Sequence, residues 1–312
     1  MHDGPDDGGG LSPDEAFGLL SNETRMTILR TLWNADEPLP FSRLLERAGV
    51  DDSGNFNYHL DQLVGHFVAR VDGGYVLREA GKSVIRTVLS GVFTADAYHE
   101  PVVVDERCPY CGSPVEFSYR DERITVRCTD CDGVVNGDEF PPGTYMSFPF
   151  PPAGLVERTP EEVIAAAHSL YDGKIIPMMG GVCPECSGRT SVAVDYCEDH
   201  EPTDGGLCRA CDSRYKVWSE YYCTHCGYSR LSALWFKLMN HAAVVSFFHE
   251  HGDLDAFVPL RKLTWENARY ITNISETVVS EEPLEVRVDI PFEGKTLHVT
   301  VDAALEVVEI EQ

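Results

Sequence analysis

Apolar residues recur every three or four positions through most of the first hundred residues, which is the period of helices with one buried face. Ser12, before Pro13, is a predicted helix N-cap, and Gly49 is a predicted helix end. Alternating residues around a glycine turn then predict a β-hairpin. The predicted elements are helices over 12–20, 22–33, 41–49, 53–65 and 79–93, and strands over 68–71 and 75–78 joined by the turn 72–74.

After residue 100, alternating patterns outnumber helical ones. A strand pair is predicted around the turn 120–123, and the Pro-, Gly- and aromatic-rich stretch 136–160 is expected to pack against its neighbours. Thr159 is a predicted cap for a helix over 160–171, and the apolar run 231–251 predicts one long buried helix. Further predictions are strands over 189–196 and 215–222, a short strand or helix over 265–271, and a meander of strands over 284–290, 296–301 and 305–310 with turns at 293–294 and 302–303.

This order of elements predicts an α+β protein of several domains. Short helices followed by a hairpin and a closing helix are typical of a winged helix-turn-helix. The predicted organisation is a disordered tail (1–11), a winged helix-turn-helix (12–95), a zinc ribbon (104–135), and a zinc-binding regulatory or dimerisation domain (155–312) that ends in the meander.

Cysteines occur in pairs separated by two residues, a spacing that directs two side chains at one point and makes half of a tetrahedral zinc site. The first two pairs flank the strand pair around residues 120–123, which predicts a zinc ribbon with four sulfur ligands. Those ligands are Cys108, Cys111, Cys128 and Cys131.

Four more half-sites lie within residues 183–226. Two strand-like segments between them favour a nested arrangement, in which the outer pairs close one site and the inner pairs a second. A cross-braced, RING-like arrangement, in which the first pair joins the third and the second joins the fourth, also fits the order. The half-sites are Cys183 with Cys186, Cys197 with His200, Cys208 with Cys211, and Cys223 with Cys226.

His200 is predicted to be a ligand because eleven cysteines and one histidine fill three four-coordinate sites with no thiol left over. Asp199 is the weaker candidate for the twelfth position. Closed sites leave no open coordination position, so we expect three structural zinc ions. The sequence also contains no HExxH, GxSxG or phosphate-binding loop, and we therefore expect no enzyme activity.

The composition indicates the environment in which the protein works. The formal charge is −26, and only 6 of the 25 basic residues are lysine. An acidic, lysine-poor chain with 43% hydrophobic residues is globular and typical of the salt-rich cytoplasm of a halophilic archaeon. Paired cysteines indicate a metal in a reducing cytoplasm, and no run of about 20 apolar residues predicts a membrane span.

One segment resembles a known family. The stretch LLSNETRMTILRTLW, followed by SGNFNYHLDQL, is similar to the ArsR-type winged-helix regulators of archaea over roughly residues 12–95. The resemblance implies a repressor-like module that binds double-stranded DNA and forms a homodimer through its first and last helices. It places the recognition helix at 53–65 and the base- and phosphate-contacting residues at Ser53, Asn55, Asn57, Tyr58 and His59, with Arg70, Arg78 and Lys82 on or after the wing.

The sequence therefore favours a sequence-specific transcriptional regulator with three structural zinc sites. The alternatives are a general initiation component that contacts RNA polymerase, and a zinc- or redox-responsive sensor. Residues 1–100 carry 8 basic and 16 acidic side chains, so phosphate attraction is expected to be modest. The sequence names no small-molecule effector.

Overall fold

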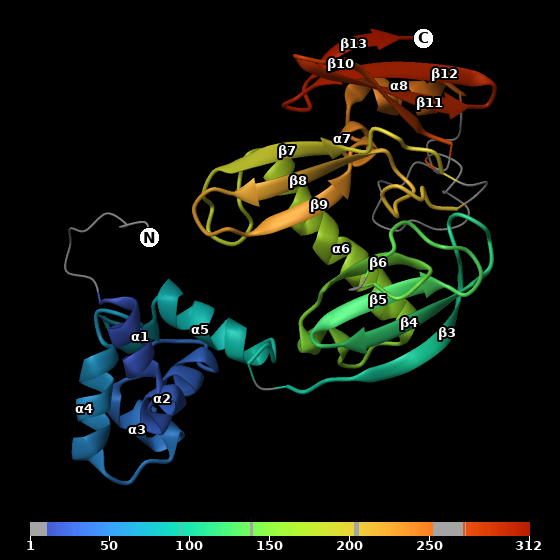
Figure 1. Ribbon diagram of the computed structural model, residues 1–312. Helices are drawn as coiled ribbons and strands as arrows, with labels where there is room; N and C mark the ends of the chain where they lie inside the picture. Colours follow the sequence, from blue (N-terminus) through green and yellow to red (C-terminus); the bar gives the residue numbers. More distant parts are fainter. Residues whose placement is uncertain (1–10, 94, 138–139, 203–205, 252–270, 272) are drawn as a thin grey trace. The chain divides into compact units, whose positions relative to one another are not determined.

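The computed structural model describes residues 11–93, 95–137, 140–202, 206–251, 271 and 273–312. The predicted tail lies outside this part of the chain except for Leu11, and the predicted element at 265–271 lies outside it except for Ile271. The chain forms two compact units, residues 1–95 and 96–312. The predicted segments 104–135 and 155–312 both fall inside the second unit. The whole is a mixed α+β protein with several antiparallel sheets (Figure 1).

The first unit consists of helices and one hairpin. Ser12 and Glu15 form a capping box at the first helix, and Gly49 ends the third with a left-handed backbone. The second helix contributes Ile28 and Leu29, both without exposed surface, to the core of this unit. In chain order the elements are α1 (Pro13–Leu20), α2 (Glu23–Trp33), α3 (Phe41–Ala48), α4 (Ser53–Leu63), β1 (Val68–Val71), β2 (Gly74–Leu77) and α5 (Glu79–Leu89).

The hairpin of the first unit is joined by a third chain segment. Leu39 makes an antiparallel bridge to Tyr75, with hydrogen bonds in both directions between their backbones. Gly74 allows this approach, because it adopts a φ of +145° and a Cβ there would overlap the backbone of Leu39. The loop between α2 and α3 is thereby fixed to the hairpin.

The second unit begins with a four-stranded antiparallel sheet ordered β3-β4-β5-β6. The predicted strand pair around 120–123 forms its centre. A strand from the aromatic-rich stretch 136–160 pairs with the second strand of that pair. This stretch therefore packs against its neighbours as expected, and it does so as part of the sheet. The strands are β3 (His99–Arg107), β4 (Pro114–Arg120), β5 (Arg123–Cys128) and β6 (Thr144–Pro149).

One long helix, α6 (Pro160–Met179), contributes to two hydrophobic cores of the second unit. Thr159 caps it together with Glu162, and the helix runs two turns further than the predicted 160–171. Val163 and Ala167 pack with the first sheet, whereas Met178 packs with the remainder of the unit. A short 3-10 helix, η1 (Pro152–Leu155), precedes α6.

Two further antiparallel sheets complete the second unit, and their buried side chains share one core. The first contains β7 (Thr190–Tyr196), β8 (Val217–Cys223) and β9 (Ser229–Ala233). The second contains β10 (Ser275–Glu281), β11 (Leu284–Phe292), β12 (Lys295–Asp302) and β13 (Val307–Glu311). The short helices α7 (Trp235–Leu238) and α8 (Ala242–His251) lie between these sheets in the sequence.

The prediction of one helix over 231–251 is wrong. Its first residues belong to β9, where Leu231 pairs with Glu220 and Ala233 with Trp218. The remaining residues form the two separate helices α7 and α8. An apolar run has no single period when consecutive pieces are buried by different neighbours, so periodicity did not distinguish strand from helix. The closing helix of the first unit also ends at Leu89, before the predicted residue 93.

Among the described residues, no helix is long and apolar enough to cross a membrane.

Candidate metal centres and polar helix face

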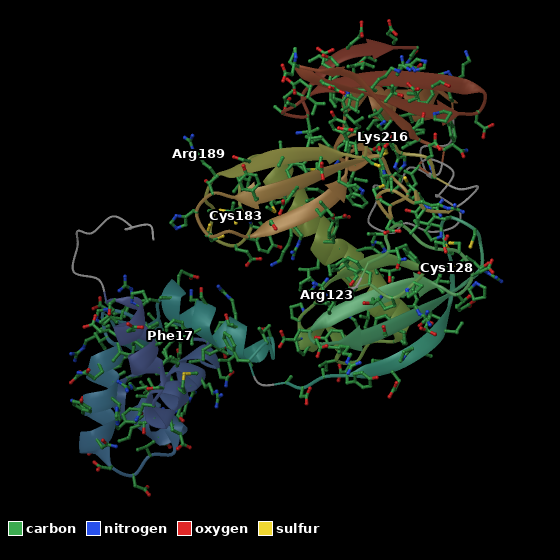
Figure 2. The ribbon with its side chains drawn as sticks, viewed as in Figure 1. Phe17, Arg123, Cys128, Cys183, Arg189 and Lys216 are labelled. Atoms are coloured by element: carbon green, nitrogen blue, oxygen red, sulfur yellow. The ribbon has the colours of Figure 1, made fainter. Side chains whose placement is uncertain are left out.

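The first cysteine cluster is built at one end of the sheet β3-β4-β5-β6. Cys108 and Cys111 precede β4, Cys128 is the last residue of β5, and Cys131 follows that strand. Pairing of Val115 with Cys128 brings the two loops together, and Cys128 is labelled at this end of the sheet in Figure 2. The Sγ atoms of Cys108 and Cys131 are 3.7 Å apart, and those of Cys111 and Cys128 are 3.4 Å apart.

These distances fit a tetrahedral ion. Four sulfurs bound at about 2.3 Å from zinc would be separated by about 3.8 Å along each edge of the tetrahedron. All four donor atoms of the cluster lie within 4.8 Å of one another. The residues present therefore suit a four-coordinate metal ion such as zinc.

The second cluster contains Cys183, Cys186, Cys223 and Cys226. The first two residues follow α6, Cys223 is the last residue of β8, and Cys226 lies in the turn between β8 and β9. Sγ distances are 3.7 Å between Cys183 and Cys226 and 3.5 Å between Cys186 and Cys223. Gly188 passes so close that a Cβ there would lie 3.1 Å and 3.2 Å from the sulfurs of Cys186 and Cys223, so a side chain would require these sulfurs to shift by a few tenths of an ångström.

The third cluster contains Cys197, His200, Cys208 and Cys211. The four inner ligands meet each other and not the outer ones, so the arrangement is nested and the cross-braced alternative is excluded. Strands β7 and β8 decide this pairing, because Tyr196 pairs with Val217 at one end and Thr190 with Cys223 at the other.

His200 is oriented as a metal ligand. Its Nδ1 is 3.4 Å from the Sγ of Cys211, and its Nε2 is 3.3 Å from the carbonyl oxygen of Arg214. An Nε2–H donated to this carbonyl leaves the lone pair on Nδ1 directed into the cluster. Burial lowers the pKa of His200, which favours the neutral ring that binds a metal. The carboxylate of Asp199 is not part of the cluster.

Backbone N–H groups surround the sulfurs. The N–H groups of Asp130 and Cys131 donate to Cys128 Sγ at 3.3 Å, and Ala210 donates to Cys208 Sγ at 3.4 Å. These hydrogen bonds stabilise thiolates, the form that binds a metal.

The three clusters thus bring together the twelve residues predicted as ligands, and each could hold a metal ion. Within the part of the chain that the structure describes, these are the groups of three or more potential ligands that lie close enough for one ion. Each has four protein donors, so a bound tetrahedral ion would have no position open for a substrate.

The polar face of α4 carries several of the residues predicted to contact DNA. Ser53, Asn55 and Tyr58 are exposed, with 59% of Tyr58 accessible, while Phe56 and Leu60 are buried in the core. The side-chain amide of Asn57 donates to Asp61 at 2.9 Å, and this contact holds the amide on its own helix.

His59 lies at the edge of this face and is half-buried. Its ring packs edge-on against Tyr58 with 5.2 Å between centroids, and Nδ1 has no hydrogen-bond partner among the described residues. Burial, and then the positive charge of Arg25, lower the pKa of His59. The ring is therefore neutral near pH 7 and adds no charge for phosphate.

The predicted phosphate-binding residues lie on or after the hairpin. Arg70 and Arg78 are exposed, and the guanidinium of Arg70 lies 5.6 Å from the ring centroid of Tyr75. Lys82 forms an ion pair with Glu79 at 2.6 Å, so a phosphate would have to compete with that carboxylate. Among the ion pairs of the described residues, Lys82 has a carboxylate partner, whereas the two arginines have none.

One residue of this face was missed in the sequence. Asp52 caps α4, and its Oδ1 accepts from the N–H groups of Gly54 and Asn55, both at 3.0 Å. A carboxylate therefore occupies the helix N-terminus, where a phosphate would otherwise bind. The signal was present, since Asp before a polar helix start is a common N-cap.

Comparisons with known proteins add two family matches. A family model described as a domain of unknown function (DUF7351) matches residues 105–307, and a second domain of unknown function (DUF7347) matches residues 13–88. Neither the search of curated proteins nor the search of solved structures found a match.

Proposed function

We propose that the chain, which belongs to the DUF7351 family, is a sequence-specific DNA-binding regulator whose first unit is a winged helix-turn-helix. The observation that carries this proposal is the polar face of α4. This helix buries Phe56, Leu60 and Leu63 against the core and exposes Ser53, Asn55 and Tyr58. A helix fixed on one side, with amide and hydroxyl groups on the other, is suited to the major groove.

The hairpin β1-β2 supports the same proposal as a wing. It follows α4 directly, is fixed to the α2–α3 loop through Leu39, and presents Arg70 and Arg78 to solvent. Arginines on such a hairpin suit the phosphates beside the groove. The similarity of this segment to ArsR-type regulators of archaea agrees with that assignment.

Exposed apolar residues support a homodimer. Phe17 on α1 is 72% exposed and Leu89 on α5 is 58% exposed. Large apolar side chains that are exposed to solvent on two helices are a reason to expect contact with a second subunit. The resemblance assigns dimerisation to the same first and last helices.

The three clusters are proposed to hold structural zinc. Their cysteine-rich donor sets, sulfur separations and backbone N–H donors suit this ion. Zinc supplies cross-links there and no reaction. Thiolate sites of this kind are stable in a reducing compartment, which supports a cytoplasmic protein.

The test is DNA binding by fluorescence anisotropy over a sodium chloride series. The probes are a duplex from the region upstream of the coding sequence and a shuffled duplex of the same composition. We expect the Asn55→Ala, Tyr58→Ala double variant to lose about tenfold or more in affinity for the first duplex and little for the second, because base contacts carry the discrimination.

Arg70→Ala with Arg78→Ala should weaken binding to both duplexes and reduce the salt slope by about 1 for each lost phosphate contact. Arg30→Ala, which removes an exposed arginine from α2, is the matched control and should change neither quantity. Equal affinity for the two duplexes would refute a sequence-specific regulator. Capture of RNA polymerase without sequence preference would then support the general initiation component.

A further inference from the structure

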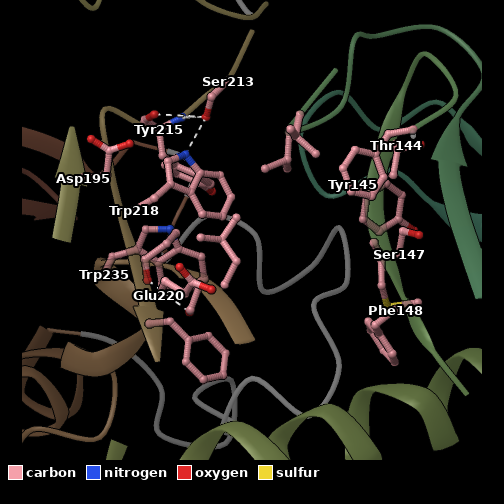
Figure 3. A pocket seen from close by; sticks show the side chains of 18 of the residues that line it. Thr144, Tyr145, Ser147, Phe148, Asp195, Ser213, Tyr215, Trp218, Glu220 and Trp235 are labelled. Atoms are coloured by element: carbon pink, nitrogen blue, oxygen red, sulfur yellow. Dashed lines mark hydrogen bonds between the residues drawn. The ribbon is translucent and has the colours of Figure 1, made fainter. Parts of the chain in front are cut away.

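The second unit contains a cavity of about 620 Å³. Residues of β6, α6 and the sheet β7-β8-β9 line it, and Figure 3 shows the labelled side chains of β6 and of this sheet on two sides of the space. Pockets of this size enclose small organic ligands. Neither the metal clusters nor the polar face of α4 explains why this unit should keep such a space.

Aromatic rings form much of the lining. Tyr215 lies 6.2 Å from Trp218 and 5.8 Å from Trp235, and Trp235 lies 5.9 Å from Phe236, measured between ring centroids. Tyr171 continues this series at 6.0 Å from Phe236. The rings therefore form one continuous aromatic surface.

The polar ends of Trp218 and Tyr171 are already bound to protein. Trp218 donates its Nε1–H to Ser213 Oγ at 2.8 Å, and Tyr171 donates its hydroxyl to the carbonyl of Leu231 at 2.9 Å. Figure 3 shows the bond from Trp218 to Ser213 as a dashed line. These bonds fix the rings, so what they offer a ligand is their π faces and edges.

Two carboxylates flank Trp218 on the same face of the sheet. Asp195 on β7 pairs directly with Trp218 on β8, and Glu220 follows Trp218 by two residues. Paired residues and residues two apart share one face, so the register puts all three on the cavity side (Figure 3). Both carboxylates are exposed.

The charge of the lining is negative. Asp195 and Glu220 oppose one ammonium group among the lining side chains, that of Lys216. An organic anion would be repelled by this lining. A neutral apolar ligand would fill the aromatic space but would gain nothing from the carboxylates and would displace their water.

We infer that this cavity binds a lipophilic organic cation, with its charge against the aromatic faces and near Asp195 and Glu220. Aromatic rings attract a cation through their negative faces, most strongly for tryptophan and where water is excluded. Cys197 and Cys211 also line the cavity, so the third metal cluster supports one of its walls. The inference concerns the second unit alone and stands whether or not the first unit binds DNA.

The test compares two ions of the same shape and opposite charge, tetraphenylphosphonium and tetraphenylborate, by tryptophan fluorescence and calorimetry on the full chain. Sodium chloride is kept at the lowest concentration at which circular dichroism is unchanged, because salt screens the charge term. We expect saturable, 1:1 binding of the cation and at least tenfold weaker binding of the anion.

The variants separate the charge from the apolar surface. Asp195→Asn with Glu220→Gln preserves shape and should weaken binding of the cation roughly fivefold or more, because it removes both carboxylates that attract the positive charge. The same double variant should leave the anion unchanged or bind it better. Trp218→Leu should weaken both ions.

The matched control removes two exposed carboxylates from β13, as Glu309→Gln with Glu311→Gln, and should change neither affinity. Metal content and circular dichroism establish that each variant is folded. Equal binding of the two ions, equal losses in the control and the test variant, or no saturable binding to folded protein would each overturn the inference.

Discussion

Removing one sulfur from the second cluster should unfold part of the second unit and leave the first unit intact. Cys223 is 2% exposed at the end of β8, and its sulfur accepts backbone N–H groups from His225 and Cys226 at 3.4 Å and 3.5 Å. Cys223→Ser replaces a thiolate ligand with a hydroxyl that does not ionise. We expect the bound metal to fall from three ions to two.

The magnitude follows from the loop that the cluster closes. A cross-link between Cys186 and Cys223 encloses the whole of β7, the third cluster and β8. For a loop of about 37 residues the lost closure entropy corresponds to about 4 kcal/mol at 25 °C. This is a large share of the roughly 5–15 kcal/mol that stabilises a whole domain.

Hydrogen exchange measured by mass spectrometry reports each region separately. Peptides from β8 and β9 should lose protection in Cys223→Ser, whereas peptides from α2 should keep theirs, because the core of the first unit is separate. The control is His225→Asn, which changes a residue of the same turn that is outside the cluster.

Full protection together with three bound metal ions in Cys223→Ser would show that this cluster is not a metal clamp. Loss of protection in α2 as well would show that the two units unfold as one.

Three further predictions concern other parts of the molecule. His200→Ala should lower the metal content from three ions to two by elemental analysis, whereas Asp199→Ala should leave three; the reverse result would reassign the twelfth ligand. Burial raises the pKa of Glu276 from its ordinary 4.5 to about 7. The folded state therefore holds this proton longer, and stability falls as pH rises from 4.5 to 7. Glu276→Gln should abolish this loss, which is worth up to about 3 kcal/mol. Denaturant unfolding at pH 5 and pH 8 measures the free energy of unfolding of both proteins. The reasoning is wrong if the variant gains no stability over the unsubstituted protein between pH 5 and pH 8. Phe17→Glu should convert the proposed dimer to a monomer, measured by light scattering, and an unchanged dimer mass would place the interface elsewhere.

Local features of the fold were readable from the sequence because short-range physics determines them. Ser12 and Thr159 cap helices through side-chain bonds to residues three positions away. Glu293 and Gly294 form the predicted turn with φ values of +47° and +77°. The two-residue gap of each cysteine pair likewise depends on a single turn of chain, so the twelve candidate ligands could be named from the sequence.

Tertiary structure decided whatever depends on which distant segments meet. The sequence left nested and cross-braced pairing open, and the register of β7 with β8 determined it. Strand pairing also made β9 from residues read as helix, because an apolar stretch satisfies its backbone with whichever partner is adjacent.

Of these features, the cavity is the one that the sequence predicts least. Asp195, Trp218 and Glu220 lie far from Tyr171 along the chain, and only the packing of the sheet β7-β8-β9 against α6 and β6 brings their side chains around one space. Spacing along the chain determined the candidate ligand pairs, whereas non-local packing determined which pairs form one cluster and which side chains line the cavity.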